Sequence, residues 1–285
     1  MKTAAIISKP GKRELESIVP QVAAWLKARG YEVAADQETA AYLPQVAVVA
    51  REKMAEKSPE FALVLGGDGT MLAAARAVDQ AGIPIMGVNV GALGFLTEIP
   101  LDELYPTLEA LVENRCQVET RSMIHCHLMR GGERIAHYDA MNDAVVGKSA
   151  IARMIEFEVR VDKDFIASYK ADGLIVSTPT GSTAYSLAAG GPILAPDVDA
   201  FIITPISPHA LTHRPLVVKD TSEVRILVKS VGEEAFLTVD GQVGVAVLDG
   251  DEVTCRRSAR QVRLLRLTRR TFFDVLRAKL KWGQR

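Results

Sequence analysis

The sequence has few cysteines and no long apolar run. Only Cys116, Cys126 and Cys255 are cysteines among its 285 residues, and no two of them form a Cys-x-x-Cys pair. A disulfide framework is therefore not expected, and a reducing compartment is favoured. No stretch approaches the ~20 apolar residues of a membrane-spanning helix, and the apolar start ends at Ser8, too early for a signal peptide. We expect a cytoplasmic protein with no membrane partner.

The chain also lacks an excess of either charge. Its 34 basic and 35 acidic side chains give a formal net charge of -1. This balance provides no overall attraction to nucleic acid or to a membrane surface. An anionic substrate would have to be bound by a local arrangement of residues. With 48% hydrophobic and 24% charged residues, the composition is that of a globular protein of one large or two modest domains.

Residues 1–118 alternate between two kinds of segment. Strands alternating with helices predict a parallel sheet with right-handed crossovers, so we expect an α/β, Rossmann-like N-terminal domain. The strand-like runs are Thr3–Ser8, Tyr31–Ala35, Phe61–Leu65 and Ile83–Val88, and the helical segments are Glu14–Arg29, Thr70–Ala81 and Leu101–Asn114.

Residues 119–267 consist mostly of short strand-like segments separated by turns. The short connections favour antiparallel pairing, so this part predicts a β-rich, β-sandwich-like C-terminal domain. A helix over Thr271–Leu280 is expected to pack back on the first domain, which would then include 268–285. The strand-like segments are Arg121–Met129, Arg134–Tyr138, Ile155–Val161, Gly173–Ser177, Glu223–Val228, Ala235–Val239 and Gln261–Leu267.

Seven arginines and no acidic residue lie between Arg256 and Arg270. Such a run could form a stripe that binds nucleic acid. Apolar residues such as Val262 and Leu264 interleave with the arginines, however, which favours a strand with one solvated basic face. We expect no nucleic-acid partner.

The most informative feature is the turn Gly66-Gly67-Asp68-Gly69-Thr70 between a predicted strand and a predicted helix. Glycines let the backbone approach a polyanion, and the start of the helix offers N–H groups to phosphate oxygens. An aspartate opposes anion binding, so a chemical role as proton acceptor is favoured. The structural alternative is that Asp68 caps the helix or shapes the turn.

This turn alone does not decide the protein family, because it occurs in NAD kinases, in lipid kinases and, in a similar form, in phosphofructokinases. Three further segments resemble NAD kinases in order and spacing: Asn89–Thr97, Ala140–Val146 and Asp172–Ser186. The resemblance extends from Leu65 to about Gly244 and indicates a bacterial member of the ATP-NAD kinase family.

The resemblance implies an activity. The enzyme would transfer the γ-phosphate of ATP, or of polyphosphate, to the 2′-hydroxyl of the adenosine ribose of NAD, giving NADP, with Asp68 as general base. Mg²⁺ or another divalent cation would arrive with ATP, because the histidines show no metal-ligand spacing and no carboxylate cage is visible. The family also implies a homodimer or homotetramer, with residues 119–267 binding NAD and forming the subunit contacts.

The resemblance also assigns binding residues. Asp143 replaces the more usual glutamate, and Lys170 stands where an arginine is common. Taken alone, an Asn-Asp pair is more often a turn, a Ser/Thr/Gly run is usually a loop, and Lys170 could form a surface ion pair. The expected NAD contacts are Asp68, Gly69, Phe95, Asn142, Asp143, Arg153, Lys170, Asp172, Thr180, Thr183, Ala184, Tyr185, Ser186, Leu187, Ala188 and Gln242, and the expected phosphate contacts are Gly66, Gly67, Gly69, Thr70 and His209.

Two rival functions remain open on sequence grounds. A lipid kinase would share the glycine-aspartate turn but would need an apolar entrance segment, and none is evident. An NAD-binding regulator without activity would be expected to have lost Asp68, which is present. Phosphofructokinase leaves Asn142 and the 178–186 segment without a role.

Overall fold

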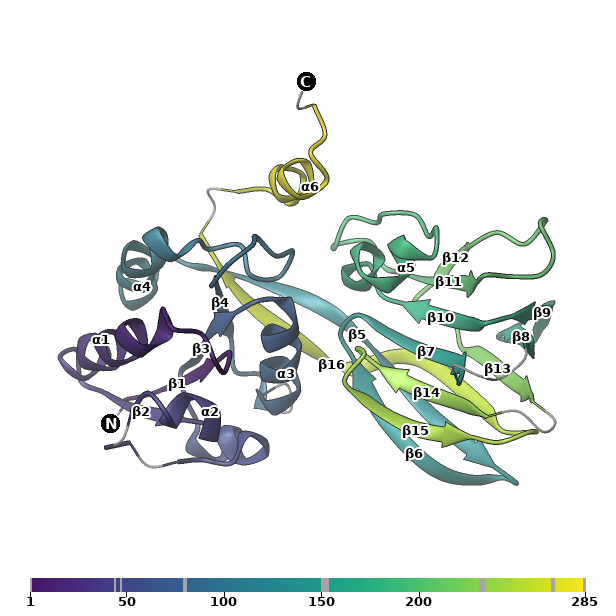
Figure 1. Cartoon of the computed structure of the whole chain (residues 1–285), viewed down its shortest axis with the longest axis horizontal. Helices are drawn as coiled ribbons and strands as arrows, with labels where there is room; N and C mark the ends of the chain where they lie inside the picture. Colours follow the sequence, from purple (N-terminus) through teal and green to yellow (C-terminus); the bar gives the residue numbers. More distant parts are fainter. Residues whose placement is uncertain are drawn as a thin grey trace. The chain divides into compact units, whose positions relative to one another are not determined.

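The structure is a computed structural model that describes residues 2–43, 45–46, 48–78, 81–149, 154–230, 234–267 and 270–283. The chain forms two compact units: unit 1 contains Met1–Thr120 and Gln261–Arg285, and unit 2 contains Arg121–Arg260. The chain passes between the units in two long strands, β5 (Gln117–Arg130) and β16 (Glu252–Arg266) (Figure 1).

Unit 1 is built on a parallel sheet, as expected from the alternating pattern. Its strands lie in the order β2-β1-β3-β4, and the end of β16 runs parallel to β4. The strands are β1 (Lys2–Ser8), β2 (Tyr31–Ala35), β3 (Phe61–Gly66) and β4 (Ile85–Asn89). The helical segments are α1 (Leu15–Lys27), α2 (Gln37–Ala40), η1 (Arg51–Lys57), α3 (Asp68–Val78), η3 (Leu101–Glu103) and α4 (Leu104–Val112).

The sheet of unit 1 is covered on both faces. Every residue of β3 and β4 is buried, as is usual for strands of a parallel sheet with helices on its two faces. Helices α1 and α4 share one core cluster with the strands, whereas α3 packs against β3 and against η1. This packing fixes the carboxyl ends of β1, β3 and β4 at one edge of the sheet, where the glycine-rich turn begins.

Unit 2 contains two antiparallel sheet regions that share one apolar core. A six-stranded sheet has the order β12-β11-β10-β7-β14-β15, and the other region contains β16-β13-β8-β9 with β5 and β6. The β-rich, antiparallel architecture is therefore confirmed. The strands are β6 (Glu133–Ala140), β7 (Asp143–Lys148), β8 (Ile155–Val161), β9 (Asp164–Ala171), β10 (Gly173–Ser177), β11 (Ala200–Ile206), β12 (Leu216–Lys219), β13 (Val224–Lys229), β14 (Ala235–Val239) and β15 (Val243–Val247).

Several elements of unit 2 differ from what the sequence predicts. Strands β7, β9, β11, β12 and β15 were not among the expected segments. The Ser/Thr/Gly run, expected as a loop, forms the short helical turns η4 (Thr180–Thr183) and α5 (Tyr185–Ala188). Local composition predicted a loop, but contacts with residues distant in sequence set the conformation of this run.

The C-terminal helix α6 (Phe272–Leu280) is grouped with unit 1, as expected. It begins at a reciprocal cap in which the Thr271 side chain accepts from the Asp274 N–H, and the Asp274 carboxylate accepts from the Thr271 N–H. The Nζ atom of Lys279 lies 5.6 Å from the ring centroid of Phe95 in the same unit. None of the helices in the described ranges is long and apolar enough to span a membrane.

Candidate active site

The glycine-rich turn joins the carboxyl end of β3 to the start of α3. Strand β3 ends at Gly66, and the carbonyl of Gly67 accepts the N–H groups of Thr70 (3.0 Å) and Met71 (3.1 Å), which closes the first turn of the helix. A Cβ atom on Gly66 would lie 2.5 Å from Oγ1 of Thr70, so this position requires glycine. The start of an α-helix at the carboxyl edge of a parallel sheet is a suitable place for an anionic ligand.

The carboxylate of Asp68 points to the loop that follows β4 rather than to its own helix. Its Oδ2 atom accepts a hydrogen bond from the N–H of Phe95 (2.9 Å). Its Oδ1 atom accepts from the N–H of Leu96 (3.0 Å), the N–H of Thr97 (3.2 Å) and the Thr97 hydroxyl (3.3 Å). Within the described ranges these are all its hydrogen bonds. Oδ2 therefore keeps a lone-pair position, since a carboxylate oxygen can accept two bonds.

Buried groups hold the 94–97 loop against Asp68. A Cβ atom on Gly94 would lie 2.0 Å from Oδ1 of Asp68, so only glycine fits there. Thr97 is fully buried, and its hydroxyl accepts a hydrogen bond from Nδ2 of Asn89 (3.1 Å). Nδ2 of Asn89 also donates to the carbonyl of Ala92 (2.6 Å). Asn89, Gly94 and Thr97 belong to the family segment Asn89–Thr97, but no individual role was expected for them from the sequence.

The second group of candidate residues, in unit 2, is organised by Asp240. The Asp240 carboxylate accepts hydrogen bonds from the backbone N–H groups of Met141 (3.2 Å), Asn142 (2.8 Å) and Asp143 (3.2 Å). Asp240 lies in the turn between β14 and β15 with a left-handed φ of 51°. Asp240 was not among the site residues expected from the sequence, although its position directly before Gly241 and Gln242 was a signal.

Asn142 and Asp143 differ in environment. The Asn142 side chain is half-buried, and within the described chain its amide group makes no hydrogen bond. Asp143 is buried, and this burial, together with the nearby charge of Asp240, raises its pKa to about 7. At neutral pH its carboxyl group is therefore poised to act as either donor or acceptor.

The Thr178–Ser186 segment folds directly onto Met141 and Asn142. The Thr178 hydroxyl donates to the carbonyl of Met141 (2.6 Å), and its N–H donates to the carbonyl of Asn142 (2.9 Å). A Cβ atom on Gly181 would lie 2.1 Å from that same Asn142 carbonyl oxygen, so glycine is required. The structure thus brings Asn142, Asp143 and the 178–186 segment together.

The hydroxyl-rich segment has a buried and an exposed side. Ser182 is buried, and the buried hydroxyls of Ser186 and Thr204 lie 3.0 Å apart. Tyr185 is 47% exposed, so a flat ligand could reach its side chain. Thr180 is buried, Thr183, Ala184 and Leu187 are half-buried, and Ala188 is exposed.

Four further candidates lie apart from this cluster or outside the described residues. Asp172 pairs with Lys148 (3.0 Å), whereas Lys170 is exposed and forms no ion pair within the described ranges. The N–H of His209 donates to the carbonyl of Lys170 (2.8 Å), which places these two residues side by side. Arg153 lies outside the described residues.

Gln242 lies in the β14–β15 turn, as expected, with its N–H donating to the carbonyl of Val239 (3.0 Å). The turn is the same one that carries Asp240. Gln242 therefore lies two residues from the carboxylate that organises Met141–Asp143.

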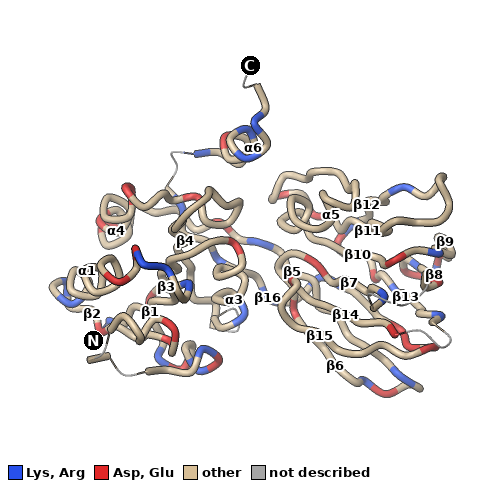
Figure 2. Tube along the Cα trace, in the orientation of Figure 1, with Lys and Arg blue, Asp and Glu red and all other residues tan. Residues whose placement is uncertain are grey.

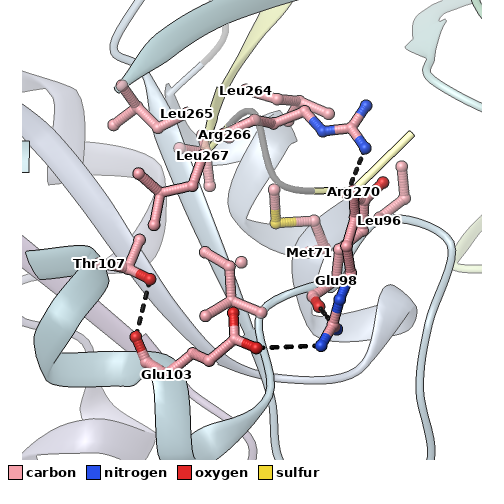
Figure 3. Close-up of a pocket in the computed structure, with 13 residues that line it drawn as sticks. Met71, Leu96, Glu98, Glu103, Thr107, Leu264, Leu265, Arg266, Leu267 and Arg270 are labelled. Atoms are coloured by element: carbon pink, nitrogen blue, oxygen red, sulfur yellow. Dashed lines mark hydrogen bonds and ion pairs between the residues drawn. The ribbon is translucent and has the colours of Figure 1, made fainter. Parts of the chain in front are cut away.

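A pocket in unit 1 contains several charged residues (Figure 3). Its charged side chains are already paired: Arg266 with Glu98 and Glu119, and Arg270 with Glu103 (3.0 Å). The Thr107 hydroxyl also donates to the carbonyl of Glu103 (2.7 Å). We assign this pocket to the packing of β16 in unit 1, because its charges serve structural ion pairs. The side chain of Arg266 was expected on a solvated strand face, but it is largely buried in its ion pair with Glu98.

Comparisons with known proteins show which family the chain resembles. Residues 4–116 match the ATP-NAD kinase N-terminal domain, and residues 141–267 match the ATP-NAD kinase C-terminal domain. The chain is 56% identical to the NAD kinase of Koribacter versatilis and 51% identical to that of Acidobacterium capsulatum, with complete coverage of each chain in both cases.

Two solved structures share the fold. Yeast NADH kinase complexed with NADH has a TM-score of 0.88 and 25% identity, covering 100% of this chain and 89% of that one. An NAD kinase from Archaeoglobus fulgidus in complex with ATP has a TM-score of 0.78 and 27% identity, covering 97% and 99% of the respective chains. The two matched domains span most of the sequence, and the chain belongs to the ATP-NAD kinase family.

Proposed function

We propose that the protein transfers the γ-phosphoryl group of ATP to the 2′-hydroxyl of the adenosine ribose of NAD, giving NADP and ADP, with Asp68 as general base. The observation that carries the proposal is the fixed carboxylate of Asp68 in the glycine turn, whose Oδ2 atom accepts a single hydrogen bond. The relatives named as NAD kinases support the substrate, and the Archaeoglobus fulgidus structure in complex with ATP supports the donor.

In the proposed reaction, Oδ2 of Asp68 accepts the proton of the 2′-hydroxyl. The ribose oxygen then forms a bond to the γ-phosphorus as the bond to the ADP oxygen breaks, so charge and protons balance. Such a transfer depends mainly on positioning and on stabilisation of charge. The hydrogen bonds from Phe95, Leu96 and Thr97 hold the base in position. The Gly66–Thr70 turn lets phosphate approach the backbone closely.

The proposed metal is Mg²⁺ that arrives with ATP. Mg²⁺ is usually bound through substrate phosphates, waters and one or two carboxylates rather than by a protein cage. The described part of the chain contains no group of three or more His, Cys, Asp or Glu side chains that could hold an ion. When bound, it would neutralise part of the phosphate charge.

NAD recognition is assigned to unit 2. The half-buried amide of Asn142 and the carboxyl group of Asp143 are suited to the vicinal hydroxyls of a ribose. The exposed ring of Tyr185 and the hydroxyls of the 178–186 segment are suited to an adenine base. Arg153, Lys170, Asp172, His209 and Gln242 remain proposed contacts on the strength of the family pattern.

The proposal also covers the setting of the enzyme. None of the three cysteines forms a disulfide, which supports a reducing compartment, and we place the enzyme in the cytoplasm as a homodimer or homotetramer. Inorganic polyphosphate is the alternative donor.

The test is an assay of the purified protein with ATP, Mg²⁺ and NAD, in which NADP is detected by an NADP-specific dehydrogenase. NADP formation is expected with NAD as acceptor. No phosphorylation of diacylglycerol or of a sphingoid base is expected. Absence of NADP with both ATP and polyphosphate, or phosphorylation of a lipid acceptor, would overturn the proposal.

A further inference from the structure

The topology of unit 1 indicates a position for ligand binding at the carboxyl ends of β1 and β3. From β1 the chain passes through α1 to β2 on one side, and it then returns to β3 on the other side of β1. Loops that leave adjacent strands in opposite directions leave a crevice at the carboxyl ends of those strands, where open α/β sheets bind ligands. The β1–α1 segment, Lys9–Glu14, and the Gly66–Thr70 turn border this point. They are joined by a hydrogen bond from the N–H of Lys9 to the carbonyl of Leu65 (2.9 Å).

The β1–α1 segment is basic. It contains Lys9, Lys12 and Arg13 within five residues. Figure 2 shows a blue stretch on the chain between β1 and α1. Gly11 has a φ of +70°, a conformation that glycine adopts without strain. The carbonyl of Lys12 accepts hydrogen bonds from the N–H of Leu15 (3.0 Å) and the hydroxyl of Tyr42 (3.5 Å). The backbone of Lys12 is thus anchored at this edge.

The ammonium group of Lys12 has no counter-charge among the described residues. Lys12 is half-buried, and among the residues placed in the structure it forms no ion pair, not even with the neighbouring Glu14. Its Nζ atom lies 4.0 Å from where a Cβ of Gly91 would be, beside the loop that continues to Phe95 and Thr97. Because no described carboxylate neutralises this positive charge, the ammonium group is suited to an anionic ligand.

We propose that Lys12 is a binding residue for the triphosphate of the phosphoryl donor, which lies in the β1–β3 crevice. This inference rests on the proposed function, because it locates the donor used in that reaction. The pyrophosphate of NAD offers the same phosphate chemistry. The donor is favoured because the triphosphate carries more charge and must extend to Asp68, which follows β3 at the same edge.

Lys12→Met tests the assignment. It keeps an unbranched apolar side chain that is one atom shorter and removes the charged amino group. With NAD saturating, the KM for ATP is expected to rise about tenfold to a hundredfold, as for loss of a charged hydrogen bond, while the KM for NAD changes less than twofold. The control is Lys27→Met, because Lys27 is exposed at the carboxyl end of α1, and it should leave both constants unchanged. Lys12→Arg should retain most of the ATP affinity.

Binding of inorganic tripolyphosphate, measured by calorimetry, separates this inference from the proposed function. The wild-type protein and Lys27→Met should bind it, and Lys12→Met should bind it at least tenfold more weakly while showing wild-type thermal unfolding. If the wild-type protein made no NADP, the proposed function would fail. The binding comparison could still support the assignment of Lys12 as a residue that binds a triphosphate. An unchanged KM for ATP and unchanged tripolyphosphate binding in Lys12→Met would overturn the inference. A selective rise in the KM for NAD would also overturn it, because Lys12 would then serve the acceptor.

Discussion

The backbone N–H of Phe95 donates a 2.9 Å hydrogen bond to Oδ2 of Asp68, across 27 positions of sequence. This bond joins the turn after β3 to the loop after β4, and the N–H groups of Leu96 and Thr97 hold the other carboxylate oxygen. Asp68 is therefore oriented by backbone groups, which cannot change rotamer. A proton acceptor fixed in this way needs little reorganisation when a hydroxyl is placed next to it.

Asp68→Asn tests the base. The amide cannot accept the proton, so kcat is expected to fall at least about a hundredfold, in the range attributed to general-base catalysis. The affinity for NAD should be retained, since the binding residues proposed for NAD lie mostly in unit 2. One side of the amide must face a backbone N–H, so a small decrease in Tm is also expected. Steady-state kinetics, NAD titration and thermal unfolding check these three points, and a kcat near that of the wild type would show that Asp68 is not the base.

Thr97 offers a finer test of how the carboxylate is positioned. Thr97→Val removes the hydroxyl that donates to Oδ1 of Asp68 and accepts from Asn89, but preserves the shape of the buried side chain. We expect kcat to fall about tenfold, corresponding to loss of one hydrogen bond to a charged group, with little change in KM for either substrate. Thr97→Ser keeps the hydroxyl and should restore most of the rate. An equal loss in both variants would show that packing, rather than the hydroxyl, matters.

The strands with a clear pattern were predictable from sequence. β8 alternates apolar and charged residues, and β10 is a short apolar run bounded by turns, so both were found with the bounds seen in the structure. In unit 1 the alternation of strands and helices likewise predicted the parallel sheet. These features depend on residues close together in the chain, which is why the sequence alone reveals them.

The architecture of the candidate site was less predictable. Asp240 organises Met141, Asn142 and Asp143 from 97 to 99 positions away, and no local pattern reports such a contact. Strand β7 begins at Asp143, although an Asn-Asp pair by itself indicates a turn. The 178–186 segment becomes helical because Thr178 and Gly181 pack on Met141 and Asn142, a tertiary contact that overrides local propensity.

Gly94→Ala should disrupt the hydrogen bonds between the 95–97 loop and the Asp68 carboxylate. The added methyl group would lie 2.0 Å from Oδ1 of Asp68, so either the carboxylate or the loop must move. We expect kcat to fall at least as far as in Thr97→Val, while thermal unfolding of the protein remains cooperative. Gly147→Ala is the control, because its added methyl would have its nearest neighbour, the Asp172 carbonyl oxygen, at an ordinary 3.8 Å. Wild-type turnover in Gly94→Ala would mean that Asp68 need not be held as the structure shows.

Asp143 should make stability fall as pH rises toward neutrality. Burial, reinforced by the charge of Asp240, raises its pKa from 3.8 to about 7. Between these two values the folded protein retains a proton that the unfolded chain releases, so the folded state loses stability as pH rises through this window. Above about pH 7 the loss is complete and is on the order of a few kcal/mol.

Asp143→Asn cannot ionise and therefore removes this contribution. The free energy of unfolding, measured with urea at pH 5 and pH 8, should consequently decrease more in the wild-type protein than in Asp143→Asn. Equal decreases in the two proteins would show that Asp143 does not titrate in this window.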